Sequence, residues 1–165
     1  MNIFKAMKPN RVYQGVSLIP FETFKVNGKK CFLLDFDNTL GPDRATEPDD
    51  YSYACVKKIQ SYGLTCCLVS NAKSERSAKI AEMLDIPCVT YAQKPRTAGV
   101  KRALELMNVT ADEAIMVGDQ VFTDVMAGNL AGCYTIMVEK YLPKEVWYVK
   151  IKRPFEAIVR FFGHF

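Results

Sequence analysis

The sequence has little that would tie it to a membrane-spanning or disulfide-stapled protein. No apolar run in its 165 residues approaches the roughly 20 residues that an α-helix needs to cross a bilayer. Charged residues interrupt the start of the chain, where a signal peptide would need its apolar segment. The six cysteines show no C-x-x-C spacing and lie mostly inside apolar stretches, so they resemble small buried hydrophobes. We therefore expect a soluble or peripheral protein in a reducing compartment, in the cytoplasm or on the inner face of the membrane.

The chain also lacks internal repeats, low-complexity tracts and Ser/Gly linkers. With 49% hydrophobic residues, a chain of this length can bury one core without metal or disulfide staples. We therefore expect a single domain over residues 1–165. No nucleic-acid recognition motif is present and the net charge of +4 is a modest excess, so no nucleic-acid partner is expected.

Positive charge is concentrated in the two flanks of the chain. Residues 1–30 carry six basic and one acidic side chain, and residues 139–165 carry six and three, whereas residues 31–138 carry ten and fourteen. Both flanks also hold many aromatic residues, which makes an anionic membrane surface a candidate partner. Residues 154–162 place apolar side chains on one helical stripe, which predicts an amphipathic helix that either packs on the domain or docks on a membrane.

Short apolar runs alternate with segments of helical period from Cys31 onward. This alternation predicts an α/β fold, a Rossmann-like three-layer sandwich with a mainly parallel sheet of about five strands. Residues 41–50, rich in Pro and Asp, predict a loop, and residues 1–30 are expected to pack on the sheet as a short helix plus loop. The strands are expected in the runs that begin at Cys31, Leu64, Ile86, Ala114 and Cys133, and the helices at Asp49–Tyr62, Ser74–Leu84 and Thr97–Met107.

Two carboxylates, Asp35 and Asp37, end the first apolar run, CFLLDFDNTL. Their i, i+2 spacing puts both on the same side of an extended chain. Such a pair can act as nucleophile and acid/base. Asp35 would attack phosphorus to form an aspartyl-phosphate, and Asp37 would protonate the leaving group and later deprotonate water. The plain alternative is a polar turn after a buried strand.

Three further apolar runs end in residue types that this chemistry needs. They lead to Ser70, to Lys94, and to Asp119 followed by Asp124. Because ligands bind beyond the carboxyl ends of parallel strands, we expect these side chains to converge at one rim. Ser70 would donate a hydrogen bond to a phosphoryl oxygen, and Lys94 would offset charge on the pentacoordinate species. Taken singly, Ser70 also suits a turn cap and Lys94 a surface position.

A phosphate dianion that approaches two carboxylates is repelled unless a cation intervenes. Mg²⁺ with oxygen ligands is the usual cation for this task. Asp35, the backbone carbonyl of Asp37 and Asp119 would hold it. Asp124 would bind it directly or support the ligands. The plain alternative for Asp124 is a carboxylate at the start of a helix.

In this order, four motifs resemble those of the haloacid dehalogenase (HAD) superfamily of phosphatases: DFDNT, Ser70, Lys94 with Pro95, and GDQVFTD. DNTL, YAQKP and VGDQVFTDVMAGNLAGCYTIMVE are similar to the capless subclass IIIA, which includes bacterial phosphatases and phosphatidylglycerophosphate phosphatases. The similarity covers about residues 12–160. The chain departs from it at SNAK, where relatives often have a second Asn, and at Leu130, where they often have Arg.

The resemblance implies a Mg²⁺-dependent phosphomonoester hydrolase with no cap domain. Its leading substrate would be phosphatidylglycerophosphate, a lipid-linked phosphomonoester, and the alternative is a soluble sugar phosphate or nucleotide. Asn38, Thr39 and Asn71 join Ser70 and Lys94 as expected substrate-binding residues. Asn38 and Thr39 would also order the loop below the nucleophile.

The spacing of the motifs supports the capless reading. Only 23 residues separate Ser70 from Lys94, and a strand and a helix consume most of them, so no lid domain fits there. An active site without a cap domain is open to a large substrate or to one held in a membrane. Exclusion of water would then fall to the substrate, a flap or a neighbouring subunit of a homo-oligomer.

A protein of another class uses the same residue types. A phospho-accepting receiver module also has strand-end carboxylates, Mg²⁺ and a lysine. The i, i+2 pair of Asp35 and Asp37 argues against it, because a second acid/base beside the nucleophile promotes turnover of the phosphoaspartate.

Overall fold

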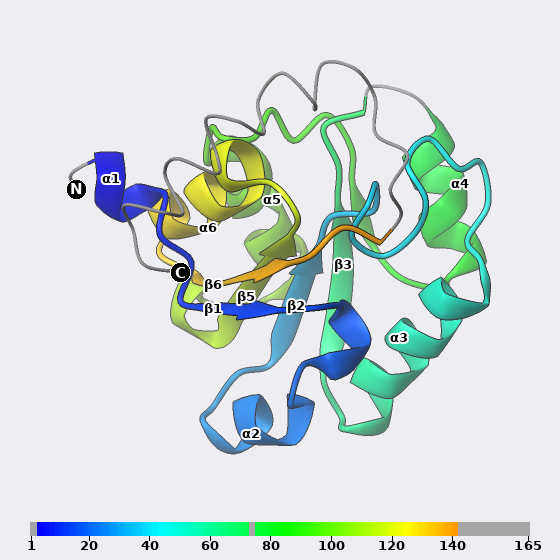
Figure 1. The fold of residues 1–165 in the computed structure, drawn as a ribbon, viewed down its shortest axis with the longest axis horizontal. Coiled ribbons are helices and arrows are strands. Elements are labelled where there is room, and N and C mark those ends of the chain that lie inside the picture. The colour runs from blue at the N-terminus through cyan, green and yellow to red at the C-terminus, as the bar shows by residue number, and fades with distance from the viewer. Residues whose placement is uncertain (1–2, 73–74, 142–165) are drawn as a thin grey trace.

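A six-stranded sheet forms the centre of the computed structural model (Figure 1), which describes residues 3–72 and 75–141. Its strands follow the order β1-β6-β5-β2-β3-β4, and every neighbouring pair is parallel. The predicted α/β class and parallel sheet are confirmed. The strands are β1 (Arg11–Tyr13), β2 (Cys31–Leu34), β3 (Thr65–Val69), β4 (Cys88–Val89), β5 (Ala114–Gly118) and β6 (Tyr134–Val138).

The sixth strand, β1, adds one strand to the expected set of about five. It lies in the N-terminal flank and pairs with β6, with Val12 opposite Met137. The side chain of Asn10 fixes this edge, because its oxygen accepts hydrogen bonds from the backbone N–H and the hydroxyl of Thr135, at 2.8 and 3.0 Å. A strand of three residues is too short to display a period of two, so its sequence carried no strand signal.

The three predicted helices are present, each within two residues of the expected bounds. Helix α3 begins after Asp49, whose carboxylate accepts a hydrogen bond from the backbone N–H of Ser52 in a capping box. Thr110 and Glu113 form a second capping box, at the start of the short turn η2. The helices and helical turns are α1 (Ile3–Ala6), η1 (Val16–Leu18), α2 (Phe21–Val26), α3 (Asp50–Ser61), α4 (Glu75–Met83), α5 (Ala98–Met107), η2 (Ala111–Glu113), the π-helical η3 (Val121–Val125) and α6 (Met126–Ala131).

Helices cover both faces of the sheet and make three layers (Figure 1). Successive side chains of a strand point to opposite faces, and β2 shows the consequence. Phe32 and Leu34 belong to the core cluster that packs under α2, α3 and α4, whereas Cys31 and Leu33 belong to the cluster under α5 and α6. All four side chains are fully buried, which explains why this strand is apolar throughout.

The connections at the carboxyl ends of the strands are short. The predicted loop at residues 41–50 runs to the start of α3, and no cap domain is inserted among the described residues. None of the helices in residues 3–72 and 75–141 has both the length and the apolar composition that crossing a bilayer requires. The amphipathic helix predicted at residues 154–162, and most of the C-terminal flank, lie outside the described residues.

Candidate active site

The carboxyl ends of β2, β3 and β5 lie side by side and bring three predicted residues to one rim. Leu34, the last residue of β2, is opposite Leu68 in β3 and Val117 in β5. Asp35, Ser70 and Asp119 each follow directly after one of these strands. The predicted convergence of strand ends is therefore present in the fold.

A cleft of about 260 Å³ opens at this rim. A larger surface hollow of about 500 Å³, beside α5, is lined by none of the predicted site residues. Arg44, Arg76, Gln120 and Thr123 line the cleft although the sequence did not single them out. The predicted residues that line it are Asp35, Asp37, Ser70, Asn71, Lys94 and Asp124.

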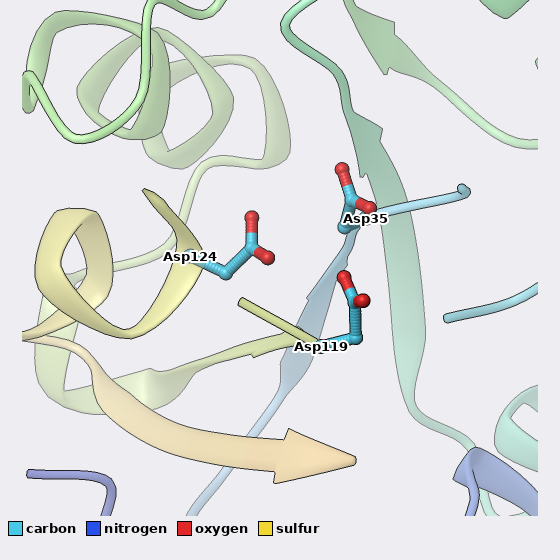
Figure 2. Close-up of side chains that lie close together, drawn as sticks. All are labelled: Asp35, Asp119 and Asp124. Atoms are coloured by element: carbon cyan, nitrogen blue, oxygen red, sulfur yellow. The ribbon is translucent and has the colours of Figure 1, made fainter. Parts of the chain in front are cut away.

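Three carboxylates lie close together at this rim of the sheet (Figure 2). Asp35, Asp119 and Asp124 each offer an oxygen, and these oxygens all lie within 4.8 Å of one another. All three residues are at most 9% exposed. An all-oxygen donor set of this charge suits a hard divalent cation. The carboxylate of Asp37 is not part of this group, and metal binding through its backbone carbonyl stays a prediction.

The π-helical turn η3 places Asp124 against the end of β5. The backbone N–H of Gln120 donates to Asp124 Oδ2 at 3.2 Å. Gly118 allows this approach, since a Cβ at that position would lie 2.2 Å from Asp124 Cγ. Asp124 therefore faces the other carboxylates rather than solvent, unlike a carboxylate that only starts a helix.

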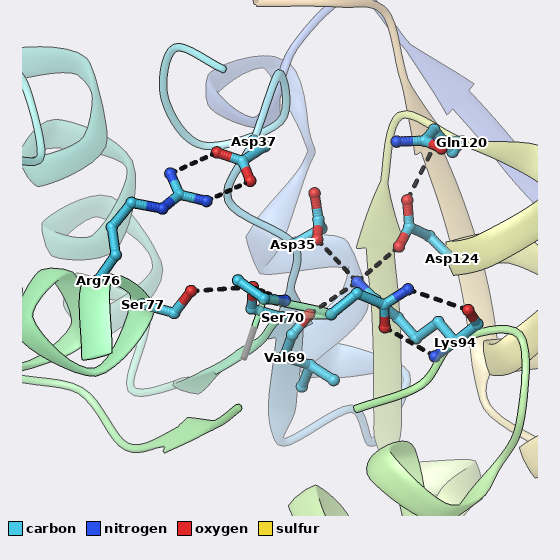
Figure 3. Close-up of polar contacts among 11 residues, drawn as sticks. Asp35, Asp37, Val69, Ser70, Arg76, Ser77, Lys94, Gln120 and Asp124 are labelled. Atoms are coloured by element: carbon cyan, nitrogen blue, oxygen red, sulfur yellow. Dashed lines mark hydrogen bonds and ion pairs between the residues drawn. The ribbon is translucent and has the colours of Figure 1, made fainter. Parts of the chain in front are cut away.

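Lys94 lies between two of the carboxylates (Figure 3). Its ammonium is 2.7 Å from Asp35 Oδ1, from Asp124 Oδ1 and from the carbonyl oxygen of Val69. The residue is 5% exposed, so it is not a surface lysine. Burial alone would lower the pKa of Lys94, but Asp124 and Asp35 outweigh burial and raise it. Lys94 is therefore a cation fixed beside Asp35.

Burial among charges of both signs changes the acidity of Asp35. Burial raises the pKa of Asp35, Lys94 lowers it, and the nearby Asp124 and Asp37 raise it again, so that it stands at about 7. A divalent cation in the acidic group would favour the ionised form of Asp35, as a nearby opposite charge does.

Asn71 forms two hydrogen bonds with the backbone of Lys94. Its amide donates to the Lys94 carbonyl at 3.0 Å, and its oxygen accepts from the Lys94 N–H at 2.7 Å. Asn71 thus couples the end of β3 to the segment after β4, in addition to lining the cleft.

The hydroxyl oxygen of Ser70 accepts hydrogen bonds from two neighbours. The backbone N–H of Ala72 lies at 3.1 Å and the hydroxyl of Ser77 at 2.9 Å. The first contact is the turn cap weighed for Ser70, and it coexists with a place in the cleft lining. With both lone pairs occupied, the Ser70 hydrogen is available to an acceptor in the cleft.

Asn38 and Thr39 are buried below the cleft, each 1% exposed, and neither lines it. Asn38 donates its N–H to the Gly41 carbonyl, and its own carbonyl accepts from the Tyr141 N–H. Their positions suit the ordering of the loop after Asp37 better than direct substrate contact.

Arg76 is the main residue of the cleft that sequence reasoning missed. It lies in the first turn of α4 and binds the Asp37 carboxylate through both terminal nitrogens (Figure 3). The helical pattern placed Arg76 on a predicted helix, but nothing in the sequence distinguishes it from a solvent-facing charge.

Comparisons with known proteins place this chain in a family. A family model described as haloacid dehalogenase-like hydrolase matches residues 40–132. A probable phosphatase, YqeG, from Bacillus subtilis (strain 168) is 26% identical over 152 residues, which cover 92% of this chain and 88% of that protein. The chloroplastic phosphatidylglycerophosphate phosphatase 1 of Chlamydomonas reinhardtii is 26% identical over 140 residues, covering 79% of this chain and 52% of that protein.

One solved structure extends the agreement to the fold. The cobalt-bound deoxy-D-mannose-octulosonate 8-phosphate phosphatase YrbI from Haemophilus influenzae has a TM-score of 0.55 at 15% identity, covering 82% of this chain and 90% of that one. At this identity the likeness concerns the fold alone.

Proposed function

Because the chain belongs to the haloacid dehalogenase-like hydrolase family and is a phosphatase, we propose that it hydrolyses phosphomonoesters by way of a phosphorylated Asp35, with Mg²⁺ as cofactor. The observation that carries the proposal is the buried contact of Asp35 with Lys94 beside two further carboxylates. This arrangement supplies a nucleophile, a fixed cation and a set of oxygen ligands at one rim of the sheet. Because the chain belongs to a hydrolase family, a hydrolase is favoured over the phospho-accepting receiver module.

In the first step, a carboxylate oxygen of Asp35 forms a bond to phosphorus while the bond between phosphorus and the leaving-group oxygen breaks. Asp37 gives a proton to that oxygen, so the product leaves as an alcohol. The hydroxyl of Ser70 and the ammonium of Lys94 offset negative charge on the phosphoryl oxygens.

In the second step, water attacks the phosphorus of phosphorylated Asp35. The new bond joins the water oxygen to phosphorus, the bond from phosphorus to Asp35 breaks, and a water proton moves to Asp37. Inorganic phosphate leaves, and both carboxyl groups return to their starting state. Asn71 keeps Lys94 in place through both steps.

The residues present fit a divalent cation, which phosphatases of this family generally use. Three buried carboxylates of like charge with oxygen donors only favour Mg²⁺ over a soft metal. Asp35, Asp119, Asp124 and the backbone carbonyl of Asp37 would hold it. When bound, Mg²⁺ would offset the charge of these carboxylates and of the substrate phosphate.

The test of the reaction is Mg²⁺-dependent release of phosphate from p-nitrophenyl phosphate. Asp35→Asn should lower kcat by about a thousandfold or more, as loss of a nucleophile does. Asp85→Asn is the matched control, because Asp85 is exposed and its φ of 54° suits Asn. Equal activity of the native protein and Asp35→Asn would remove Asp35 from the role of nucleophile.

For the substrate, we propose a lipid-linked phosphomonoester of the phosphatidylglycerophosphate type. Three observations support it: the name of the Chlamydomonas relative, the basic aromatic flanks, and a cleft that no cap covers among the described residues. A panel of lipid, sugar and nucleotide phosphates, with co-sedimentation on anionic vesicles, tests this idea. Failure to bind vesicles, with much faster turnover of a soluble phosphate, would replace the lipid by a soluble substrate.

A further inference from the structure

Asp37 is held at the cleft by an arginine from another element. Arg76 donates from Nη1 to Asp37 Oδ1 at 2.8 Å and from Nη2 to Asp37 Oδ2 at 2.6 Å (Figure 3). These two parallel bonds make a fork that fixes both the direction and the rotation of a carboxylate. The backbone N–H of Arg44 adds a third bond to Asp37 Oδ1 at 3.0 Å.

The guanidinium of Arg76 is itself fixed. Its Nη1 also donates to the carbonyl of Ala45 at 2.9 Å, so Arg76 links α4 to two points, Asp37 and Ala45, of the connection between β2 and α3. The side chain is 19% exposed. The hydrogen bond to Asp37 is the first cause that raises the pKa of Arg76. This contact is therefore a partly buried, bidentate ion pair and not a loose surface one.

The two carboxylate oxygens of Asp37 accept different numbers of hydrogen bonds. Each carboxylate oxygen can accept about two hydrogen bonds. Oδ1 accepts from Arg44 and Arg76, which uses its capacity, whereas Oδ2 accepts only from Arg76 among the described residues. Asp37 and Asp35 line the same cleft. Asp37 therefore has one acceptor site left, and it is on Oδ2.

We propose that Arg76 is a positioning residue, which holds the Asp37 carboxylate so that the remaining acceptor site of Oδ2 receives the proton of the hydrolytic water. The inference rests on the proposed function, and it concerns its second step. The water oxygen bonds to phosphorus, the bond from phosphorus to Asp35 breaks, and the water proton moves to Asp37 Oδ2. Arg76 forms and breaks no covalent bond in this step.

The test separates the two chemical steps with p-nitrophenyl phosphate and Mg²⁺. Its nitrophenolate leaves without needing a proton, so misplacement of Asp37 should slow only the hydrolysis of phosphorylated Asp35. In stopped flow, Arg76→Met should give a burst of about one nitrophenolate per protein, followed by a steady rate lowered by about 10- to 100-fold. Acid quenching with labelled substrate should show the trapped phosphoprotein.

Three variants sharpen the result. Lys79→Met, on the exposed side of the same helix, should match the native protein. Arg76→Lys should recover part of the steady rate, because a lysine keeps the charge but not the fork. Adding Arg76→Met to Asp37→Asn should change the steady rate by no more than about twofold, since both changes remove one interaction.

The outcomes distinguish the inference from the function on which it rests. A raised KM, or a lower rate without a burst or trapped phosphoprotein, would overturn the positioning role of Arg76 while Asp35→Asn stays inactive. Full activity of Asp35→Asn would overturn the proposed function, and the inference with it. The thermal unfolding midpoint of each variant shows that the comparison is made on folded protein.

Discussion

The protonation of Asp35 links one residue to the stability of the protein. In water an aspartate has a pKa of about 3.9. In the folded protein the pKa of Asp35 rises to about 7, first because of burial and then because of Asp124 and Asp37, against the effect of Lys94. The folded state therefore binds this proton more tightly than the unfolded state does.

The sign of the pH dependence follows from this difference. Between about pH 4, the unfolded pKa, and pH 7, the folded one, ionisation of Asp35 favours the unfolded state. We predict that, in EDTA, the free energy of unfolding of the native protein falls with rising pH over this window, relative to Asp35→Asn. Urea unfolding of both proteins at several pH values measures the difference.

Mg²⁺ provides the control for this prediction. With the cation bound, the ionised form of Asp35 is favoured, so the difference in pH slope between native protein and Asp35→Asn should shrink. Parallel pH profiles of the two proteins in EDTA would contradict the prediction.

The sequence predicts half of the residues that line the cleft, but not all of their contacts. Asp35, Ser70 and Asp119 were predictable because each follows an apolar strand, and strand ends meet at one edge of a parallel sheet. The partners of Arg76 were not, because a charged residue on a helix face is usually solvated. The bonds from Asn71 to the Lys94 backbone depend on how two loops approach in space, which spacing alone does not encode.

At the scale of elements, the passage from β5 into η3 sets the position of Asp124. The strand ends at Gly118, and the turn brings Asp124 back over the strand end. A Cβ on residue 118 would lie 2.2 Å from Asp124 Cγ and 2.3 Å from its Oδ2. The glycine is therefore required by contact with a site residue.

We predict that Gly118→Ala displaces Asp124 from Lys94 and lowers both stability and activity. The overpacking should cost roughly 1–3 kcal/mol of unfolding free energy. The kcat for p-nitrophenyl phosphate should fall at least about tenfold, as expected when a site residue is misplaced by an ångström or so. Urea unfolding and steady-state assays measure the two effects.

Gly28→Ala is the matched control for this prediction. Its Cβ would meet nothing within 4 Å, but its φ of +80° disfavours a side chain. We expect a cost of about 1 kcal/mol with unchanged kcat. If Gly118→Ala retained full activity, Asp124 would not need the position that the glycine permits.

Element types were predictable wherever the period of apolar residues was long enough. Helix α5 and the strands β2 and β5 follow directly from such patterns. The short strand β1 was missed because pairing with β6, and not its own sequence, makes it a strand. The π-helical form of η3, a turn of five residues, was also not predicted.

At the scale of the whole molecule, folding gathers like charges that an unfolded chain keeps apart. Asp35, Asp119 and Asp124 come from segments up to 89 residues apart and lie within 4.8 Å of one another. Lys94 offsets only part of their charge, since its ammonium contacts Asp35 and Asp124. A cation that binds this group stabilises the folded state, because the unfolded chain offers no such site.

We therefore predict that Mg²⁺ raises the thermal unfolding midpoint and that EDTA lowers it. At a Mg²⁺ concentration a hundredfold above its Kd, linkage gives about 2.7 kcal/mol of stabilisation. For a domain of this size, that corresponds to a shift of roughly 5–11 °C. Differential scanning fluorimetry with a Mg²⁺ series measures the shift.

Asp119→Asn should reduce the shift sharply while Asp85→Asn keeps it, because only Asp119 belongs to the acidic group. If Asp119→Asn showed the native response, the cation would bind elsewhere, and the fold would then hold three buried carboxylates together with Lys94 as their main counter-charge.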